Sequence, residues 1–368
     1  MIIDIILPYK EIFSKNKASA VSLTVKNSAE FSKYKDSINV YGQYIENPFL
    51  EINFTGIKTN KFFDLGNNRS ILLKYIKLSK NKPYQKKIIE MHNRPYLFNL
   101  AIKKNIKYPI SLHFHNDPRE MKGSKKMKQR EYIAKNAAAV YFVSQYIKDC
   151  FLEGLNDNYK NLHVLPNAIQ RKIIKKPEKE KKILFIGRLV PQKGCHLFVE
   201  AIKEIVKDNK DWTFTIIGTP KAGQDKINLN YAKNLITEFK SLGDNIEYLG
   251  FIPNDEVRKI LEVTSILVVP SIWQEPFALT ALEGICSGAA VIASKVGGMS
   301  EMLEDTGYLI DSIDKDKLKK AIKDLILNKD LLLEFQHKSW SKYRYNQTDI
   351  VNKQDNFRDI IINNLEVA

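Results

Sequence analysis

From about residue 183 to residue 310 the chain alternates short apolar runs with amphipathic helical segments, and this alternation restricts the fold more than any other sequence feature. Six runs have the length and apolar character of buried strands: KILFIG (182–187), TFTIIG (213–218), IEYLG (246–250), SILVVPS (265–271), AAVIAS (289–294) and GYLI (307–310). Over 194–208, between the first two runs, apolar residues recur at helical spacing. Such alternation predicts a parallel sheet with helices on both faces.

The first half of the chain alternates less regularly, with strand-like runs IIDIIL (2–7), SINVYG (37–42), KIIEMH (87–92), ISLHFH (110–115) and AVYFVS (139–144). The charged segment LPNAIQRKIIKKPEKEKK (165–182) is typical of a linker, and we predict a hinge over 168–182. The α/β architecture expected is two doubly wound, Rossmann-like domains facing each other across a cleft. These are residues 1–168, joined by a C-terminal helix (348–368), and residues 169–347. Ligands bind such sheets at the carboxyl ends of the strands.

The basic excess lies in the first half: residues 1–180 hold 33 Lys and Arg against 16 Asp and Glu, a net charge of +17, while the whole chain carries +16. Such a surface is either simply solvated or binds an anionic partner: a membrane leaflet, a phosphorylated glycolipid or nucleic acid. No RRM, KH or helix-turn-helix signature is present, so we do not expect nucleic acid. No apolar run is long enough to span a membrane, the first residues lack a leader pattern, and Cys150, Cys195 and Cys286 are widely spaced. These features favour a cytoplasmic setting.

The stretch ILFIGRLVPQKG (183–194) has the character of a phosphate-binding loop. A strand ends at Gly187, and two cations, Arg188 and Lys193, follow before a helix that we expect to start near Gly194. Glycine permits close backbone approach, and a helix N-terminus flanked by cations favours a bound phosphate. The Walker order G-x-x-x-x-G-K-[ST] is absent. The competing interpretation is two surface charges at a tight turn.

The stretch SIWQEPFALTALEGICSG (271–288) places two carboxylates eight residues apart. Pro276 suits the first position of a helix, which puts Glu275 at the helix mouth and predicts a buried stripe of Phe277, Ala281 and Ile285. Glu283 lies at a different angle and need not face the core. Such carboxylates can accept hydrogen bonds from hydroxyls while the helix mouth holds a phosphate, which suits a nucleotide sugar. The alternative is that Glu275 complements the helix dipole and Glu283 is solvated.

Together these two stretches resemble the retaining GT-B glycosyltransferases of family 4, a resemblance that covers nearly the whole second half of the chain. It implies that Arg188 and Lys193 bind the donor diphosphate, that Glu275 contacts the donor sugar and that Glu283 binds the ribose. Further donor contacts are implied for Gly187, for the backbone at Ile252, which reads the base, and for the backbone N–H groups of Phe277, Ala278 and Leu279. Relatives have glycine in place of Ala278, a departure from the family pattern.

In the first half, IEMHNRP (89–95) and LHFHNDPREMKGSKK (112–126) follow strand candidates and resemble the subset of this family that builds lipopolysaccharide core or related glycolipids. The resemblance implies that His115 lines the cleft near the transferred sugar. His92, Asn93, Arg94 and Asn116 are then acceptor-side or cleft residues, while His113 is better explained as a core histidine. Ser144 and Asn167 also occupy matched positions. The small residue Ser19, between Ala18 and Ala20, replaces the usual glycine loop near the diphosphate.

The resemblance implies transfer of a hexosyl unit, with retention, from a UDP, GDP or ADP sugar to a lipopolysaccharide-core acceptor. A simple diacylglycerol lipid is the alternative acceptor. The basic first domain would bind the anionic inner face of the cytoplasmic membrane peripherally. No cofactor and no metal are expected: Asp314 and Asp316 precede a Lys-rich helix and are interpreted as helix capping. The alternative of another class is a non-catalytic protein that binds nucleic acid or membrane.

Overall fold

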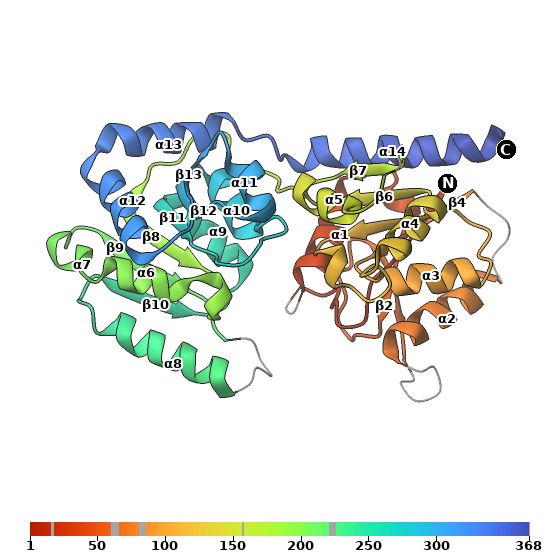
Figure 1. The fold of residues 1–368 in the computed structure, drawn as a ribbon, viewed down its shortest axis with the longest axis horizontal. Helices are drawn as coiled ribbons and strands as arrows, with labels where there is room; N and C mark the ends of the chain where they lie inside the picture. Colours follow the sequence, from red (N-terminus) through yellow and green to blue (C-terminus); the bar gives the residue numbers. More distant parts are fainter. Residues whose placement is uncertain (16–17, 60–65, 81–85, 157, 221–225, 368) are drawn as a thin grey trace. The chain divides into compact units, whose positions relative to one another are not determined.

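The computed structural model describes residues 1–368 except 16–17, 60–65, 81–85, 157, 221–225 and 368 (Figure 1). The chain forms two compact units. Unit 1 contains Met1–Ala168 and Gln347–Ala368, and unit 2 contains Ile169–Asn346, one residue short of the expected end at 347. Each unit has one sheet whose strand pairs are all parallel, which confirms the predicted α/β class with two doubly wound sheets.

The sheet of unit 1 has the strand order β3-β2-β1-β4-β5-β6-β7. Its strands are β1 (Ile2–Ile6), β2 (Ile38–Gln43), β3 (Asn53–Ile57), β4 (Lys87–His92), β5 (Ile110–Phe114), β6 (Ala139–Phe142) and β7 (Leu162–Val164). Its helices are α1 (Ala20–Phe31), α2 (Asn67–Lys80), α3 (Pro95–Lys103), α4 (Met127–Asn136), α5 (Gln145–Leu152) and the returning α14 (Gln347–Val367). The strand order reverses between β1 and β4, and this switch point is where a doubly wound sheet opens a crevice for a ligand.

The sheet of unit 2 has the order β10-β9-β8-β11-β12-β13 and reverses between β8 and β11. Its strands are β8 (Glu180–Ile186), β9 (Thr213–Ile217), β10 (Ile246–Gly250), β11 (Thr264–Val269), β12 (Ala290–Ser294) and β13 (Gly307–Ile310). Its helices are α6 (Cys195–Ile202), α7 (Ile205–Asp208), α8 (Lys226–Lys240), α9 (Asn254–Val263), α10 (Leu279–Ser287), α11 (Gly297–Leu303), α12 (Lys315–Leu327) and α13 (Lys329–Ser341). All six predicted strands of this half are present.

Two strands of unit 1 were not predicted. β3 has mostly exposed side chains, and β7 is only three residues long, so neither presents the apolar run by which the other strands are recognised. The predicted helix start at Pro276 is wrong: α10 begins at Leu279, after the left-handed residue Ala278. The predicted buried stripe is nevertheless present, because Phe277, Ala281 and Ile285 are all buried.

The segment after residue 168 is irregular, as expected of a linker, but it is fixed on unit 2. Arg171 donates to the carbonyls of Cys286 and Trp340, both at 2.9 Å, and its guanidinium lies 3.9 Å from the centre of the Trp340 ring. Lys179 donates to the carbonyls of Glu262 and Ser287, both at 2.7 Å. Most of the segment 168–182 thus belongs to unit 2, and the hinge remains a prediction.

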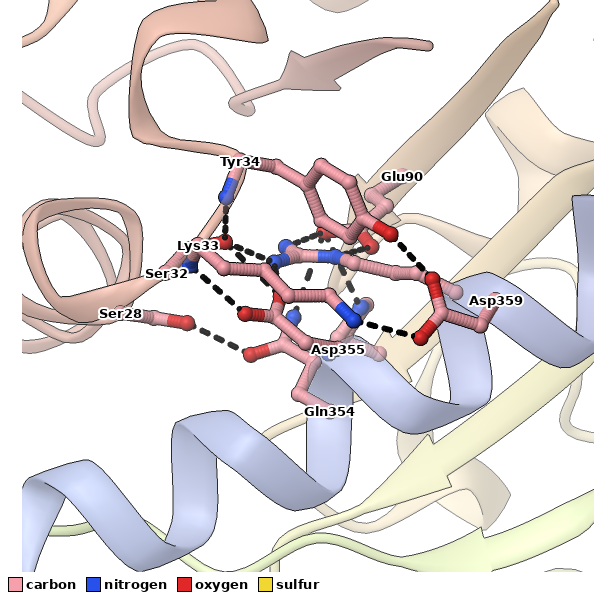
Figure 2. Close-up of polar contacts among 10 residues, drawn as sticks. Ser28, Ser32, Lys33, Tyr34, Glu90, Gln354, Asp355 and Asp359 are labelled. Carbon is pink, nitrogen blue, oxygen red and sulfur yellow. Dashed lines mark hydrogen bonds and ion pairs between the residues drawn. The ribbon is translucent and has the colours of Figure 1, made fainter.

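Helix α14 packs against α1 and β4 of unit 1 through polar groups (Figure 2). Ser28 donates to Gln354 at 2.5 Å, Ser32 donates to Asp355 at 2.8 Å, and Asp359 accepts from Lys33 at 2.6 Å and from Tyr34. The C-terminal segment thus completes unit 1.

Candidate functional site

The loops after β8 and β11 flank the switch point of unit 2 and are packed directly on each other. Gly194 adopts φ 68°, and a Cβ on it would lie 1.8 Å from the carbonyl oxygen of Pro270. The amide of Ile272 donates to the carbonyl of Gln192 at 2.9 Å. Only glycine allows this approach, so the sequence GRLVPQKG fixes one loop against the other.

Lys193 and Glu275, one from each loop, meet in an ion pair. The Nζ atom of Lys193 lies 2.6 Å from Oε1 of Glu275, and the Ser271 hydroxyl donates to the same oxygen at 2.6 Å. Glu275 is only 3% exposed. A carboxylate so deeply buried needs a cation and hydrogen-bond donors, and both are present. Glu275 is therefore not an exposed group that merely complements a helix dipole.

A third loop, after β12, holds the backbone of Glu275. The amide of Gly298 donates to the carbonyl of Glu275 at 2.8 Å, and the amide of Gly297 donates to the side chain of Gln274 at 2.8 Å. Gly297 has φ 51°, and a Cβ there would lie 2.3 Å from the Glu275 carbonyl oxygen. Three loops from the carboxyl edge of the sheet thus determine the position of one carboxylate.

Ala278, the N-cap residue of α10, adopts φ 61° and ψ 78°. Glycine is the residue that enters this left-handed region without cost, whereas alanine pays about 1–2 kcal/mol. This chain therefore adopts the left-handed conformation at position 278 although the residue is not glycine. On one side of Ala278, Phe277 is buried and its ring packs edge-on against Tyr345. On the other side, Leu279 is the first residue of α10.

Glu283 lies on the second turn of α10 and is partly buried, so it is not a solvated side chain. Burial raises the pKa of its carboxyl group to about 7, while Arg258 of α9 acts in the opposite direction. Glu283 and Arg258 line a cavity of about 60 Å³ with residues 169–173 and the end of α10. The structure thus brings Lys193 and Glu275 together and gives Glu283 a different neighbour, Arg258.

The remaining unit 2 candidates lie at the same carboxyl edge. Arg188 is exposed directly after β8, and the amide of Gly187 donates to the carbonyl of Ile217 at 3.0 Å. Ile252 is half-buried in the loop after β10, beside Phe251, which is 76% exposed. In addition, the side chain of Asp314 accepts from the amides of Asp316 and Lys317, which confirms its interpretation as a helix cap.

In unit 1 the carboxyl ends of β4 and β5 carry a stack of imidazoles, His92, His113 and His115, here called the histidine column. The His92 and His113 rings lie 4.3 Å apart at an interplanar angle of 15°. Nδ1 of His92 lies 2.9 Å from Nε2 of His115, a hydrogen-bond distance. Asn93, with φ 53°, ties the two strand ends, because its side-chain oxygen accepts from the amide of His115 at 2.8 Å.

The histidine column is uncharged at neutral pH. Burial lowers the pKa of His92, His113 and His115 well below 6.5, and the neighbouring imidazoles act in the same direction. A cavity of about 40 Å³ adjoins the column and Tyr141 of β6. This arrangement suits hydrogen bonding by neutral imidazoles rather than charge stabilisation. His113 is buried, as expected of a core histidine, but it also links β4 to β6 through its ring contacts.

The part of the chain that the structure describes contains one cluster with metal-ligand spacing: the ligand atoms of Glu90, His92 and His113 lie within 4.8 Å of one another. Glu90, however, is bound by the guanidinium of Arg358 at 2.8 Å. The His92 and His113 rings also lie in nearly parallel planes with centroids 4.3 Å apart, so lone pairs in these planes do not converge on one ion at about 2.1 Å. We therefore interpret the cluster as part of a hydrogen-bonded column.

The other unit 1 candidates are dispersed. Arg94 precedes α3 and donates to the carbonyl of Asn93 at 2.6 Å, and Asn116 is exposed. The Ser19 hydroxyl caps α1 by accepting from the amide of Ser22 at 3.2 Å. Asn16 and Lys17 of the same loop lie outside the described residues.

Sequence reasoning missed Ser271, Gly297, Glu90 and Arg358. Gly297 lies outside the motifs singled out in the sequence, although its close packing on the Glu275 backbone explains why glycine is needed there. Glu90 had one signal: an acidic residue at an inward position of an otherwise apolar strand needs a buried partner. Nothing in the sequence indicates that Arg358 is that partner.

Comparison with known proteins adds three findings. Residues 166–346 match the family of glycosyl transferases group 1. An uncharacterized glycosyltransferase of Methanocaldococcus jannaschii is 31% identical over 304 residues, which are 80% of this chain and 80% of the relative. A lipopolysaccharide 1,2-N-acetylglucosaminetransferase of Salmonella typhimurium is 25% identical over 260 residues, 66% of this chain and 64% of the relative.

Two solved structures share the fold. Anabaena HepE, crystallised in complex with UDP, superposes with a TM-score of 0.78 at 18% identity and covers 98% of this chain and 100% of its own. Sucrose-phosphate synthase from Thermosynechococcus elongatus superposes with a TM-score of 0.77 at 15% identity. The match covers 98% of this chain and 99% of that chain. The likeness to these glycosyltransferase structures confirms the GT-B architecture predicted from the sequence.

Proposed function

Because the chain belongs to the group 1 glycosyl transferases, we propose that it transfers a hexosyl unit, with retention, from a nucleotide diphosphate sugar to a membrane-associated acceptor. The observation that carries this proposal is the Lys193–Glu275–Ser271 cluster at the switch point of unit 2. A carboxylate held by a cation, next to the N-terminus of α10, matches a donor with both hydroxyls and phosphates.

In the proposed mechanism the donor diphosphate binds at the loop after β8. Arg188 and Lys193 stabilise the negative charge that develops on the departing nucleotide, and Glu275 accepts hydrogen bonds from the sugar hydroxyls. Glu283 holds the ribose, and the backbone at Ile252 contacts the base. Glu275 already binds Lys193 and Ser271, so we assign it to donor positioning rather than to covalent attack. The acceptor hydroxyl then replaces the diphosphate on the same face of the sugar. No metal or other cofactor is part of this proposal.

The acceptor side of the proposal lies in unit 1. His115 contacts the transferred sugar, and Arg94 and Asn116 belong to the acceptor side. The +17 net charge of residues 1–180 favours peripheral association with the anionic inner face of the cytoplasmic membrane. None of the described helices is both long and apolar enough to cross a bilayer. Lipopolysaccharide core is the favoured acceptor, since the Salmonella relative is named for lipopolysaccharide, and a diacylglycerol lipid is the alternative.

The donor assignment is tested by thermal shift and calorimetry of the full chain with UDP, GDP and ADP, then with the corresponding sugar nucleotides. We expect one nucleoside diphosphate to bind and its sugar nucleotide to be turned over. Lys193→Ala should weaken nucleoside diphosphate binding. Lys317→Ala, which removes an ion-paired lysine of α12, is the matched control and should bind as the wild type does. A chain that binds none of the three nucleotides would overturn the proposed function.

The acceptor is tested separately with the donor so identified, by offering lipopolysaccharide core and diacylglycerol in vesicles of anionic or neutral lipid. Product with core and stronger binding to anionic vesicles are expected. Product with diacylglycerol alone would replace the favoured acceptor by the alternative. Binding to nucleic acid without any turnover would instead support the non-catalytic interpretation.

A further inference from the structure

Arg358 of α14 is a fully buried cation held between two carboxylates. Its Nε and Nη2 atoms donate to the two oxygens of Glu90, both at 2.8 Å, and its Nη1 atom donates to Asp355 at 2.8 Å. Arg358 is 0% exposed, and Glu90 and Asp355 are each 1% exposed. Figure 2 shows both carboxylates within this network between α14 and the rest of unit 1. A bidentate hydrogen-bond geometry of this kind is specific to a guanidinium.

Glu90 connects this network to the histidine column. It precedes His92 by two residues on β4, so the two side chains lie on the same face of the sheet. An oxygen of Glu90 lies 3.8 Å from Nε2 of His113, which stacks on His92. His92 in turn lies 2.9 Å from His115. A continuous series of contacts therefore runs from the C-terminal helix to the imidazole expected at the transferred sugar.

Arg358 offsets one of the two carboxylate charges in the network next to the histidine column. The charged groups that face it are Glu90 on β4 and Asp355 and Arg358 on α14, and β6 contributes Tyr141, whose pKa burial raises further above its usual range. Glu90 acts to raise the pKa of His92, and Arg358 acts to lower it. Arg358 also lowers the pKa of His113. Without the guanidinium, a buried carboxylate would stand next to three neutral imidazoles and would favour proton uptake by them.

We propose that Arg358 is a positioning residue: by pairing with Glu90 it adds to the burial that keeps His92 and His113 neutral, and so preserves the contact between Nδ1 of His92 and Nε2 of His115 as one between uncharged imidazoles. The role of His115 in transfer rests on the proposed function, whereas the coupling of Arg358 to the column does not. The structure thereby assigns to the last helix of the chain an effect on a group that it does not touch.

The first test follows the imidazole signals of the full chain by NMR as the pH is lowered. The chain has six histidines, few enough to assign by single replacement. In Arg358→Gln we expect His92 or His113 to take up a proton at a pH about one unit or more higher than in the wild type, the usual effect of a charge at this distance. The double variant Glu90→Gln/Arg358→Gln should restore the wild-type titration, because it removes both charges.

Asp359→Asn separates charge from helix docking. Asp359 holds the same helix through Lys33 and Tyr34 on the surface and does not contact Glu90. This variant should therefore weaken the packing of α14 on unit 1 without changing the pH at which the histidines take up protons. Unchanged histidine midpoints in Arg358→Gln, or an equal shift in Asp359→Asn, would overturn the proposal. Where Arg358→Gln fails to fold, recovery of the folded chain by the double variant supports the charge argument, and no recovery overturns it.

The second test is the pH dependence of turnover with the donor found above. Arg358→Gln should lose kcat on the acid side at a higher pH than the wild type, with KM for the donor unchanged, since unit 2 is untouched. A uniform loss of kcat at every pH would indicate a merely structural role and contradict the proposal. A wild type without turnover would defeat the proposed function and leave the NMR result intact.

Discussion

The two units solve the same electrostatic problem, a buried carboxylate beside a ligand site, in opposite ways. In unit 2 Glu275 is paired with Lys193, a cation from the neighbouring loop of the same site. In unit 1 Glu90 is paired with Arg358, a cation 268 residues later in the chain, and the imidazoles of the adjoining histidine column are neutral. On the proposed function, this difference suits a charged diphosphate at unit 2 and an uncharged hydroxyl at the histidine column of unit 1.

Of the variants that test this difference between the two units, the largest effect, a loss of kcat, is expected from removing the carboxylate of Glu275 in unit 2. Glu275→Ala should lower kcat by about 10²–10³-fold, the usual loss when one preorganised polar contact to the reacting group is removed. Activity is measured by release of nucleoside diphosphate, and folding by circular dichroism. Glu304→Ala, an exposed acid of the same unit, is the control. Near-normal turnover of Glu275→Ala would show that the ion pair is structural only.

A second prediction concerns the glycine contact that holds the two loops of unit 2 together. Gly194→Ala places a Cβ 1.8 Å from the Pro270 carbonyl oxygen at a left-handed φ, and it should lower the free energy of unfolding by about 2–4 kcal/mol. The free energy of unfolding is measured by denaturant titration. Gly66→Ala is an informative comparison, since Gly66 also has positive φ but has no neighbour within 4 Å of an added Cβ among the described residues. Equal losses in both variants would mean that backbone strain, and not loop contact, decides the cost.

A third prediction asks which unit responds to pH. Burial raises the pKa of Glu283 to about 7, whereas the column histidines have pKa values well below 6.5, so between pH 6 and 8 Glu283 changes charge and the histidine column does not. The ionised carboxylate is the better acceptor for ribose hydroxyls, so affinity for the nucleoside diphosphate should rise about tenfold over this range. In Glu283→Gln the part of the affinity increase that comes from ionisation of Glu283 should be absent. Any pH dependence that remains in this variant then comes from titration of the ligand itself. An identical pH profile in both proteins would contradict the assignment.

The same group makes a prediction about stability. The pKa of Glu283 is raised in the folded chain above its usual 4.5, so folding favours its protonated form. Its contribution to stability is complete below about pH 4.5 and is lost as the pH rises towards 7, where a buried charge forms. Glu283→Gln should therefore be more stable than the wild type at pH 8, with little difference at pH 5, in thermal unfolding.

The smallest expected effect is at Ala278. Replacement by glycine relieves the left-handed strain but increases the entropy of the unfolded chain, so Ala278→Gly should stabilise unit 2 by about 0.5–1 kcal/mol. Denaturant titration measures this change. A destabilised variant would show that the Ala278 methyl group makes packing contacts that outweigh its strain.

Local patterns predicted most of the fold because each buried strand presents a continuous apolar run. They failed where burial is weak, as in β3 and β7, and at Pro276, where the preference of proline for a first helical turn was overridden by the contacts of the Glu275 backbone with Gly297 and Gly298. Lys193 and Glu275 were each singled out through their own family motif, Lys193 together with Arg188 and Glu275 together with Glu283. Their direct contact, and the pairing of Glu90 with Arg358, depend on packing between segments far apart in the chain, which no local pattern encodes.

The pairing of Glu90 with Arg358 also has a consequence for the order in which the chain matures on the ribosome. Arg358 is synthesised 268 residues after Glu90, a delay on the order of tens of seconds at ordinary rates of elongation. During that interval all of unit 2 is synthesised and most of it has emerged, while Glu90 in the sheet of the first unit has not yet met its partner. The half of the enzyme that is made first is therefore the half that is finished last.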